Sequence, residues 1–312
     1  MIIVSLILVY GVILVNGWTD APNSVATAIS SGAIKYKNAI ILCGIFNFIG
    51  VILGCLIDTS VAKFVFSIGD NSNYSTVIVC ISLFTMITFG VLCSFFGLPS
   101  SESHAMISSM IGASFYLSKD VNSLKTMGKV FVFTVFSCIL ALVVSYFTRM
   151  IFRWKLPYKN LEYISSSLSA TMHGFQSGLK FLGVIAYLLN IDLISNASVF
   201  PLSLSVGLVL GLGALLGGKK IMSTMGDNIV KITHISSFSS DIGTYITLLI
   251  CSLLGMPVST GNVKCLSIIG VGLYEKQKIN KKTTTKLLIS FVIVFPICFL
   301  IGYFLMKLFI NF

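Results

Sequence analysis

The stretch Gly97-Leu-Pro-Ser-Ser-Glu-Ser-His104 recurs in the second half of the chain as Gly255-Met-Pro-Val-Ser-Thr-Gly-Asn262. The two copies align without gaps as far as Tyr116 and Tyr274, and five of the seven matched positions hold Gly, Pro or Ser. Chance similarity between two apolar segments would preserve Leu and Ile instead. The chain therefore contains an internal duplication.

A second polar segment precedes each copy at nearly equal distance. Asn16-Gly-Trp-Thr-Asp-Ala-Pro-Asn23 precedes the first copy, and His173-Gly-Phe-Gln-Ser-Gly-Leu-Lys180 precedes the second. We expect each half to contain a polar break, two long spans, a Gly-x-Pro-x-Ser break and one more span. Because five crossings is an odd number, the second half is expected to enter the membrane from the opposite side.

The composition excludes an ordinary soluble fold. The 312 residues are 56% hydrophobic and 10% charged, with a mean hydropathy of +0.98, whereas soluble domains carry about 25% charged residues. Several apolar runs approach the roughly 20 residues that a membrane-spanning helix needs. The runs are residues 1–15, 39–57, 76–96, 127–146, 200–216, 242–254 and 287–309. We predict an all-α integral membrane protein of two inverted-topology repeats, with about five segments each and broken or re-entrant helices at the midplane.

The net charge of +11 does not indicate nucleic-acid binding, because the basic residues lie in short loops between apolar runs. Cytoplasmic loops are generally the positive ones. With ten crossings, this rule places fourteen of the 21 basic residues inside and both termini outside a plasma membrane. The inside clusters are Lys35 and Lys37; Arg149, Arg153, Lys155 and Lys159; Lys219, Lys220 and Lys231; and Lys276, Lys278, Lys281, Lys282 and Lys286. The expected units are a first repeat over 1–148, a cytoplasmic linker over 149–160 and a second repeat over 161–312.

Inverted repeats with interrupted segments are typical of secondary transporters, whose broken helices meet near the bilayer midplane. Backbone groups freed inside the membrane are tolerated where they line a cavity or contact a ligand. The four segments also hold the polar side chains expected at that depth, which mark a transport path. These are Asn16, Thr19, Asp20, Asn23 and Ser24; Ser100, Ser101, Glu102, Ser103 and His104; His173, Gln176, Ser177 and Lys180; and Ser259, Thr260, Asn262 and Lys264.

The Gly-x-Pro-x-Ser segments are expected to begin helices, because Pro suits a first turn and Ser or Thr suits a cap. A helix N-terminus with nearby hydroxyls binds a tetrahedral oxyanion, although the same residues also serve as simple caps. The candidate anion-binding residues are Ser100, Ser101, Ser103, Gln176, Ser177, Ser259 and Thr260.

Asp20 and Asn23 offer hard oxygen donors for Na⁺, or Asp20 carries a proton instead. Thr19, Glu102 and Asn262 complete the candidate cation-coupling set, with Glu102 either in the site or near the cytoplasmic face. We expect His104 and His173 to be hydrogen-bonded packing residues. Lys180 either attracts the anion or extends to the interface.

At these motifs the sequence resembles the inorganic phosphate transporter (PiT) family of low-affinity phosphate permeases, over the whole chain and in order. Residues 16–23 and 173–180 resemble the family's Asn-Gly-x-x-Asp-x-x-Asn and His-Gly-x-Asn-Asp-x-x-Lys motifs, and 97–104 and 255–262 its paired Gly-x-Pro-x-Ser segments. The glycine-bounded loop at 217–226 is also similar. The resemblance implies phosphate import by symport with Na⁺ or H⁺, at a site where the repeats meet.

Three departures from the family pattern stand out. Gln176-Ser177 replaces the usual Asn-Asp, Glu102 stands where Ser or Thr is usual, and Gly261-Asn262 replaces Thr-His. The loss of the second acidic residue leaves the number and identity of the coupling cations open.

Other functions compete with this interpretation. An anion channel needs no carboxylates beside its anion site, so Asp20 and Glu102 disfavour it. A permease for sulfate or another tetrahedral oxyanion is the nearer alternative, and only phosphate brings a proton to donate to a carboxylate. No catalytic motif indicates an enzyme, and no cofactor is expected beyond the coupling ion. The expected partners are phosphate, the cation and the lipid bilayer, with a homodimer left open.

The charge pattern makes a testable prediction about topology. In a cysteine-free variant, a single Cys at Asn71 should react with an impermeant maleimide from outside intact cells, and a single Cys at Asn160 should react only from inside, because the positive-inside rule puts the two loops on opposite faces. Labelling of both positions from one side contradicts the inverted repeat.

Overall fold

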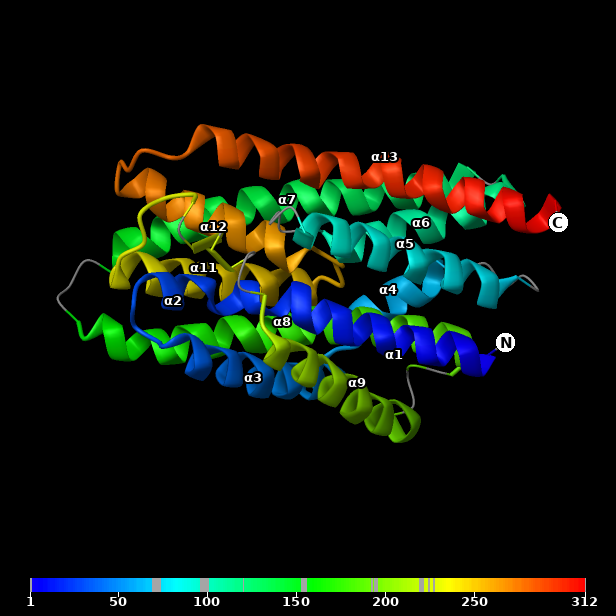
Figure 1. The fold of residues 1–312 in the computed structure, drawn as a ribbon, viewed down its shortest axis with the longest axis horizontal. Helices are drawn as coiled ribbons and strands as arrows, with labels where there is room; N and C mark the ends of the chain where they lie inside the picture. Colours follow the sequence, from blue (N-terminus) through cyan, green and yellow to red (C-terminus); the bar gives the residue numbers. More distant parts are fainter. Residues whose placement is uncertain are drawn as a thin grey trace.

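A computed structural model describes residues 2–68, 74–95, 101–119, 121–152, 156–191, 193, 196–218, 222–223, 225–226 and 228–311. Every regular element in these ranges is helical, and the long helices run roughly side by side along the molecule (Figure 1). Several positions singled out above lie outside the described residues, namely Asn71, Gly97, Leu98, Pro99, Ser100, Arg153, Lys155, Lys219 and Lys220.

The described elements fall into two series, one from each half of the chain. The first series is α1 (Ile2–Thr19), the 3₁₀ turn η1 (Ala21–Val25), α2 (Ala26–Ser30), α3 (Tyr36–Ile57), α4 (Ser60–Ile68), α5 (Ser75–Phe95), α6 (Glu102–Ser118) and α7 (Val121–Ile151). The second series is α8 (Tyr158–Leu189), α9 (Asn196–Leu216), α11 (His234–Leu253), α12 (Thr260–Tyr274) and α13 (Lys281–Asn311).

The structure is that of a multi-pass membrane protein. Among the described residues, six helices are long and apolar enough to cross a membrane, and they cover Ile2–Ser30, Tyr36–Ile57, Ser75–Cys93, Asn122–Ile151, Val199–Leu216 and Lys281–Asn311. Large apolar side chains such as Ile3 and Phe95 are about three-quarters exposed, at 74% and 73%. An exposed apolar surface of this kind fits lipid and not water.

The first polar segment breaks a helix as expected. α1 ends at Thr19 and η1 follows, because Pro22 has no N–H to donate and its ring crowds the preceding turn. Both expected helix starts are also confirmed: α6 begins at Glu102 and α12 at Thr260.

The second polar segment is not a break, and that expectation was wrong. Residues 173–180 lie within α8, which is continuous from Tyr158 to Leu189. The segment has no proline, and its glycines serve close packing. A Cβ on Gly174 would lie 2.1 Å from the carbonyl oxygen of Asn47 on α3, and one on Gly178 would lie 2.5 Å from a methyl carbon of Val51.

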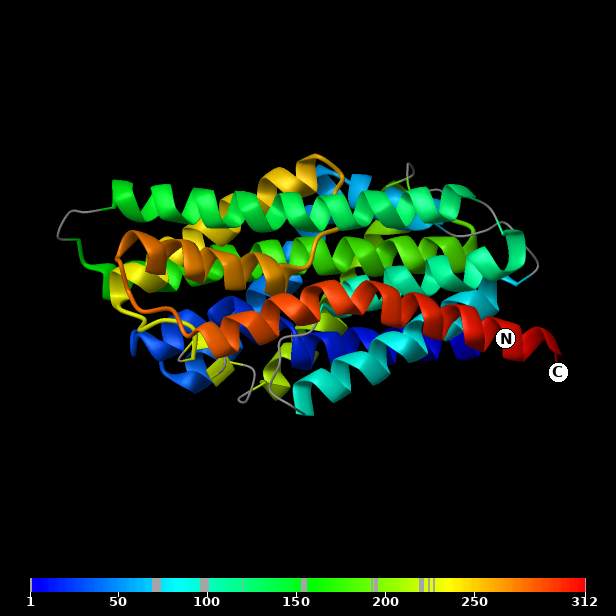
Figure 2. The same cartoon turned by 90° about the horizontal axis from the view of Figure 1, so that it is seen from above.

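Helices of the two series exchange partners. α3 packs along α8 while α9 packs along α1, and α13 packs along α6 while α12 packs along α7. The crossing of α13 with the first series is visible from above in Figure 2. Each half therefore completes its packing with helices of the other half.

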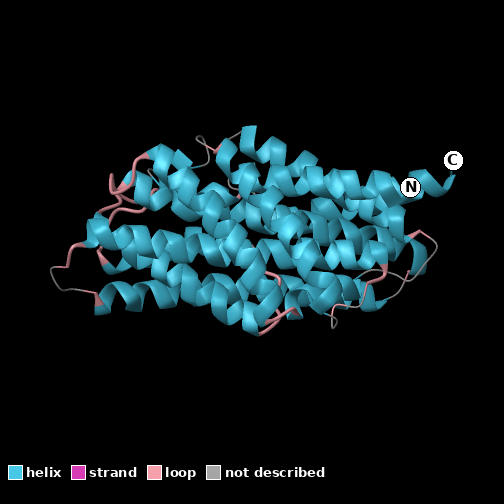
Figure 3. Ribbon diagram, turned by 90° about the horizontal axis from the view of Figure 1, so that it is seen from below, coloured by secondary structure: helices cyan, strands magenta, loops and turns pink. Residues whose placement is uncertain are grey.

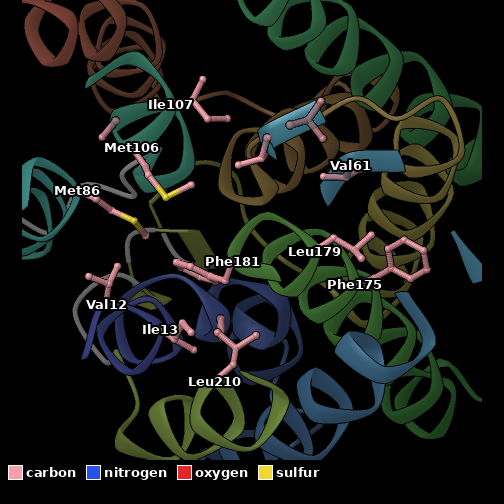
Figure 4. Packing of buried hydrophobic residues seen from close by; sticks show 14 of the residues in the cluster. Val12, Ile13, Val61, Met86, Met106, Ile107, Phe175, Leu179, Phe181 and Leu210 are labelled. Carbon is pink, nitrogen blue, oxygen red and sulfur yellow. The ribbon is translucent and has the colours of Figure 1, made fainter. Parts of the chain in front are cut away.

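Apolar side chains from several helices meet at the centre. Figure 4 shows Ile13 of α1 beside Leu210 of α9, and Phe175 beside Leu179 on α8. All four are buried. The buried apolar core therefore includes side chains from both halves.

Both termini lie at one end of the molecule (Figure 1), and the helical bundle is elongated in the view from below as well (Figure 3). The α2–α3 and α12–α13 connections, the end of α7 and the start of α8 lie at the opposite end (Figures 1 and 2). These regions belong to three of the four basic clusters expected inside, and they lie away from the termini. Which end faces the cytoplasm stays a prediction.

Two glycines matched in the duplication make equivalent helix contacts. A Cβ on Gly112 would lie 2.1 Å from the Phe299 carbonyl oxygen, and one on Gly270 would lie 2.3 Å from that of Leu142. We expect Gly112→Ala and Gly270→Ala each to destabilise the fold by about 1–3 kcal/mol. The measurement is a thermal melt with a thiol-reactive dye, which reports exposure of buried cysteines such as Cys265.

Gly128→Ala is the matched control for these glycine variants. Gly128 also lies in a helix, but nothing lies within 4 Å of its added Cβ, and alanine favours a helix by about 1 kcal/mol. Its melting temperature should therefore stay unchanged or rise. Equal losses in all three variants contradict the close-packing explanation.

Candidate functional site

The candidate site lies where the starts of α6 and α12 meet the middle of α8. Lys180 of α8 joins the two starts: its Nζ donates to Ser103 Oγ at 3.0 Å and to the Val258 carbonyl oxygen at 2.6 Å. Its side chain is buried, so it does not extend to an interface. One ammonium is therefore held between two helix N-termini.

Asp20, at the end of α1, lies on the α12 side of this site. Its carboxylate accepts hydrogen bonds from Asn23 Nδ2 at 3.0 Å and Thr260 Oγ1 at 3.0 Å. His173 Nε2 lies 3.3 Å from Asp20 Oδ2. The carboxylate thus connects the α1 break with the first residue of α12 and the middle of α8.

His173 has a second contact that orients its ring. Asn47 Nδ2 donates to the Cys43 carbonyl oxygen at 2.8 Å, so Asn47 Oδ1 is the atom that faces His173 Nδ1 at 2.6 Å. His173 Nδ1 must then be the donor, which directs Nε2 toward Asp20. His173 packs as expected, and it also touches the candidate cation site, which sequence reasoning missed.

Glu102, the first residue of α6, contacts the end of α1. Its carboxylate accepts from Asn16 Nδ2 at 2.9 Å and from Thr19 Oγ1 at 2.5 Å. The side chain is buried, so Glu102 lies inside the helical bundle. The break after α1 therefore contains one carboxylate, that of Asp20, and a second carboxylate, that of Glu102, packs against it from α6.

The hydroxyls of Ser101 and Ser259 bind within their own helix starts. Ser101 Oγ contacts His104 Nδ1 at 2.5 Å, and Ser259 Oγ donates to Asn262 Oδ1 at 3.1 Å. The two pairs occupy equivalent repeat positions. Ser259 also caps α12, because its Oγ accepts from the Asn262 backbone N–H, whereas Ser101 stands at the N-cap position of α6 without a side-chain cap bond.

His104 is a packing residue, as expected. Its Nε2 contacts Thr134 Oγ1 at 3.1 Å, and its ring lies 4.9 Å from that of Phe295. Gln176, by contrast, turns toward the segment before α12, where its Nε2 donates to Ser252 Oγ at 2.9 Å and to the Met256 carbonyl oxygen at 3.1 Å.

Several candidate residues keep a buried polar atom without a hydrogen-bond partner. Within the part of the chain that the structure describes, these atoms are Asn16 Oδ1, Asn23 Oδ1, Gln176 Oε1, Ser177 Oγ and Asn262 Nδ2. A buried polar group without a partner costs about 1–3 kcal/mol. His173 Nε2 is a further atom of this kind on the same segments. These atoms are available to contact a ligand.

A small cavity of about 10 Å³ adjoins Asp20. It is lined by Asn23, Ser24, Ser169, His173, Thr244, Leu248, Thr260 and Lys264, and its volume is about that of one water-sized sphere. A far larger groove of about 800 Å³ lies elsewhere, between α1, α5 and α13, with apolar lining such as Leu8, Phe84 and Phe309. The small cavity, with its polar lining, is the one that suits a polar ligand, whereas the apolar groove suits contact with lipid.

A second buried charge cluster was missed by sequence reasoning. Asp241 of α11 pairs with Lys264 of α12, and it also accepts from Thr27 Oγ1 at 2.8 Å. Asp241 directly precedes the apolar run at 242–254 and follows the serine-rich stretch 236–240. The sequence did offer a signal for a buried Asp241, namely its position next to that apolar run. The helix α11 begins before the run, at His234, and so includes Asp241.

Comparisons with known proteins agree with this architecture. The probable low-affinity inorganic phosphate transporter of Bacillus subtilis is 27% identical over 303 residues, covering 92% of this chain and 91% of the relative. That of Rhizobium meliloti is 29% identical over 305 residues, covering 92% and 90%. A solved structure described as the sodium-dependent phosphate transporter has the same fold, with a TM-score of 0.84 at 18% identity over 99% of this chain and 98% of that one.

A family comparison settles the assignment. Residues 16–160 and 155–302 match the model of the phosphate transporter family, and these stretches contain all four polar segments that form or adjoin the site. The relatives are named as transporters and not as enzymes. The chain belongs to the phosphate transporter family.

Proposed function

We propose that this protein imports inorganic phosphate across the plasma membrane by symport with Na⁺, or with H⁺ in its place. The observation that carries the proposal is Lys180, held between the starts of α6 and α12 by Ser103 Oγ and the Val258 carbonyl oxygen. Two helix N-termini and an ammonium attract a tetrahedral oxyanion. Relatives named as phosphate transporters support the choice of anion.

The proposed phosphate ligands lie around that ammonium. Ser103 and Thr260 stand at the two helix starts, and Gln176 and Ser177 lie one turn before Lys180 on α8. Gln176 Oε1 and Ser177 Oγ have no partner among the described residues. Ser101 and Ser259 would redirect their hydroxyls from His104 and Asn262 when the anion binds.

The proposed cation ligands are Asp20 and Asn23, with Thr19, Glu102 and Asn262 supporting them. Asn23 donates through its amide nitrogen to Asp20, which leaves Asn23 Oδ1 available as an oxygen ligand. Carboxylate and amide oxygens suit a hard cation. The fold neighbour is described as sodium-dependent, which favours Na⁺ as the first ion to test.

Transport of phosphate into a cell requires such coupling. Moving a divalent anion against an interior negative by about 100 mV costs roughly 4.6 kcal/mol, at about 2.3 kcal/mol per charge. Two co-transported cations remove that electrical cost. The proposed cation site lies beside the proposed anion site, so that the cation and phosphate can be bound and moved together.

We further propose that the two series of helices are inverted repeats joined by a cytoplasmic linker at 149–160, with both termini external. The exchanged packing of α3 on α8 and α9 on α1 supports two equivalent halves. Both termini lie at the same end of the molecule (Figure 1), which supports an even number of membrane crossings.

The cation proposal predicts the behaviour of Asp20→Asn. Purified protein in proteoliposomes should lose uptake of radiolabelled phosphate driven by an imposed Na⁺ or pH gradient, because the neutral amide no longer compensates a cation at membrane depth. Weak phosphate binding should remain. Arms with Na⁺ alone, a pH gradient alone and excess sulfate identify the coupling ion and the preferred anion.

Unchanged cation dependence in Asp20→Asn would make Asp20 structural, and Glu102→Gln would then be the next variant to assay. Uptake of sulfate in preference to phosphate by the unaltered protein would overturn the choice of substrate.

The anion proposal predicts matched effects at repeat positions. Ser101→Ala and Ser259→Ala should each raise the KM for phosphate about 10- to 100-fold, since a hydrogen bond to a charged group is worth about 1.5–3 kcal/mol. Thr88→Ala, whose hydroxyl bonds within an exposed part of α5, is the control. Unchanged KM in both serine variants contradicts a symmetric anion site.

A further inference from the structure

The buried ion pair of Lys264 and Asp241 takes no part in the proposed phosphate or Asp20 sites. Lys264 is 1% exposed and Asp241 is 0% exposed, and their charged groups are in direct contact. Buried ion pairs are weak contributors to stability, because desolvation offsets the attraction. Stability alone therefore does not explain why these two charged residues are buried together.

Hydroxyl groups from two further elements surround this pair. Thr27 Oγ1 of α2 donates to Asp241 Oδ1 at 2.8 Å and accepts from Lys264 Nζ at 3.0 Å. Ser165 and Ser166 of α8 donate to Asp241 Oδ2 at 3.1 Å and 2.7 Å. The Lys264 ammonium thus contacts a carboxylate from α11 and a hydroxyl from α2. The hydroxyls of Ser165 and Ser166 hold the carboxylate in position.

We propose that the ammonium of Lys264 is a tethered cation, occupying a site that would otherwise bind a mobile monovalent cation such as Na⁺. Carboxylate and hydroxyl oxygens are the hard donors that such a cation takes, and an ammonium carries the same single charge. The chain then supplies one positive charge itself, from α12.

The position of Lys264 places this charge beside the proposed mobile-cation site. Lys264 follows Thr260 by four residues on α12, which is about one helical turn, and Thr260 donates to Asp20. Both residues line the small cavity together with Asn23 and His173. Without the tethered ammonium, the transporter would need one more mobile cation in this region.

Lys180 provides an internal contrast. Its hydrogen bonds go to a serine hydroxyl and a backbone carbonyl, both uncharged, whereas Lys264 contacts a carboxylate. Removal of Lys180 therefore leaves no carboxylate at its ammonium position, while removal of Lys264 leaves Asp241 to attract a replacement cation.

The test is a thermal melt of purified protein in Na⁺ and in choline at equal ionic strength. Variants are made in the Asp20→Asn background, which removes the mobile-cation site of the proposed function. Asp20→Asn/Lys264→Met should melt about 5 °C higher at saturating Na⁺ than in choline, because a ligand bound by the folded state alone raises the melting temperature. Asp20→Asn alone should show no such difference.

Two controls separate the explanations. Adding Asp241→Asn to the Lys264→Met variant should abolish the Na⁺ response, because it removes the carboxylate that binds the ion. Asp20→Asn/Lys180→Met should gain no Na⁺ response. If the melting temperature of Asp20→Asn alone still depends on Na⁺, that result counts against the proposed function. The additional Na⁺ response that appears on adding Lys264→Met still tests the tethered cation.

Equal melting temperatures of the Lys264→Met variant in Na⁺ and choline overturn the proposal. So does a Na⁺ response that persists after Asp241→Asn. Failure to recover the Lys264→Met variant in a Na⁺-containing buffer also overturns it, because Na⁺ is required by the proposal to replace the ammonium.

Discussion

The whole arrangement depends on one constraint: an ionisable group inside a bilayer needs a partner within the protein, because lipid offers none. Asp20, Glu102, Asp241, Lys180 and Lys264 are all buried. Each has partners on another element, and several of these elements come from the opposite half. The fold must therefore bring the two halves together before its charges are compensated.

This constraint explains the exchanged packing of the helices. Thr260 of the second half binds Asp20 of the first, while Ser103 of the first half binds Lys180 of the second. Close helix contacts at Gly112 and Gly174 join α6 to α13 and α8 to α3, which are also contacts between the two halves. Packing and charge compensation thus support the same interface between halves.

The interior contains charges of both signs in different settings. Lys180 donates its hydrogen bonds to uncharged oxygens at two helix starts, an arrangement that suits an anion. Lys264 is neutralised by Asp241. Asp20 and Glu102 are held by side chains such as Thr260 and Asn16. The proposed substrate site and the proposed tethered cation therefore differ in whether the lysine donates to uncharged oxygens or contacts a carboxylate.

The sequence by itself determined the membrane class, the duplication, the helix break near Pro22 and the helix starts at Ser101 and Ser259, because composition, proline and caps act through local chemistry. It also singled out most of the residues that lie around the candidate site. Only the tertiary structure decided that residues 173–180 remain helical, since their glycines pack against α3. It likewise decided the pairing of Lys264 with Asp241, 23 residues apart, and with Thr27, 237 residues apart. Such contacts depend on which faces of separate helices meet, and no local sequence pattern encodes that choice.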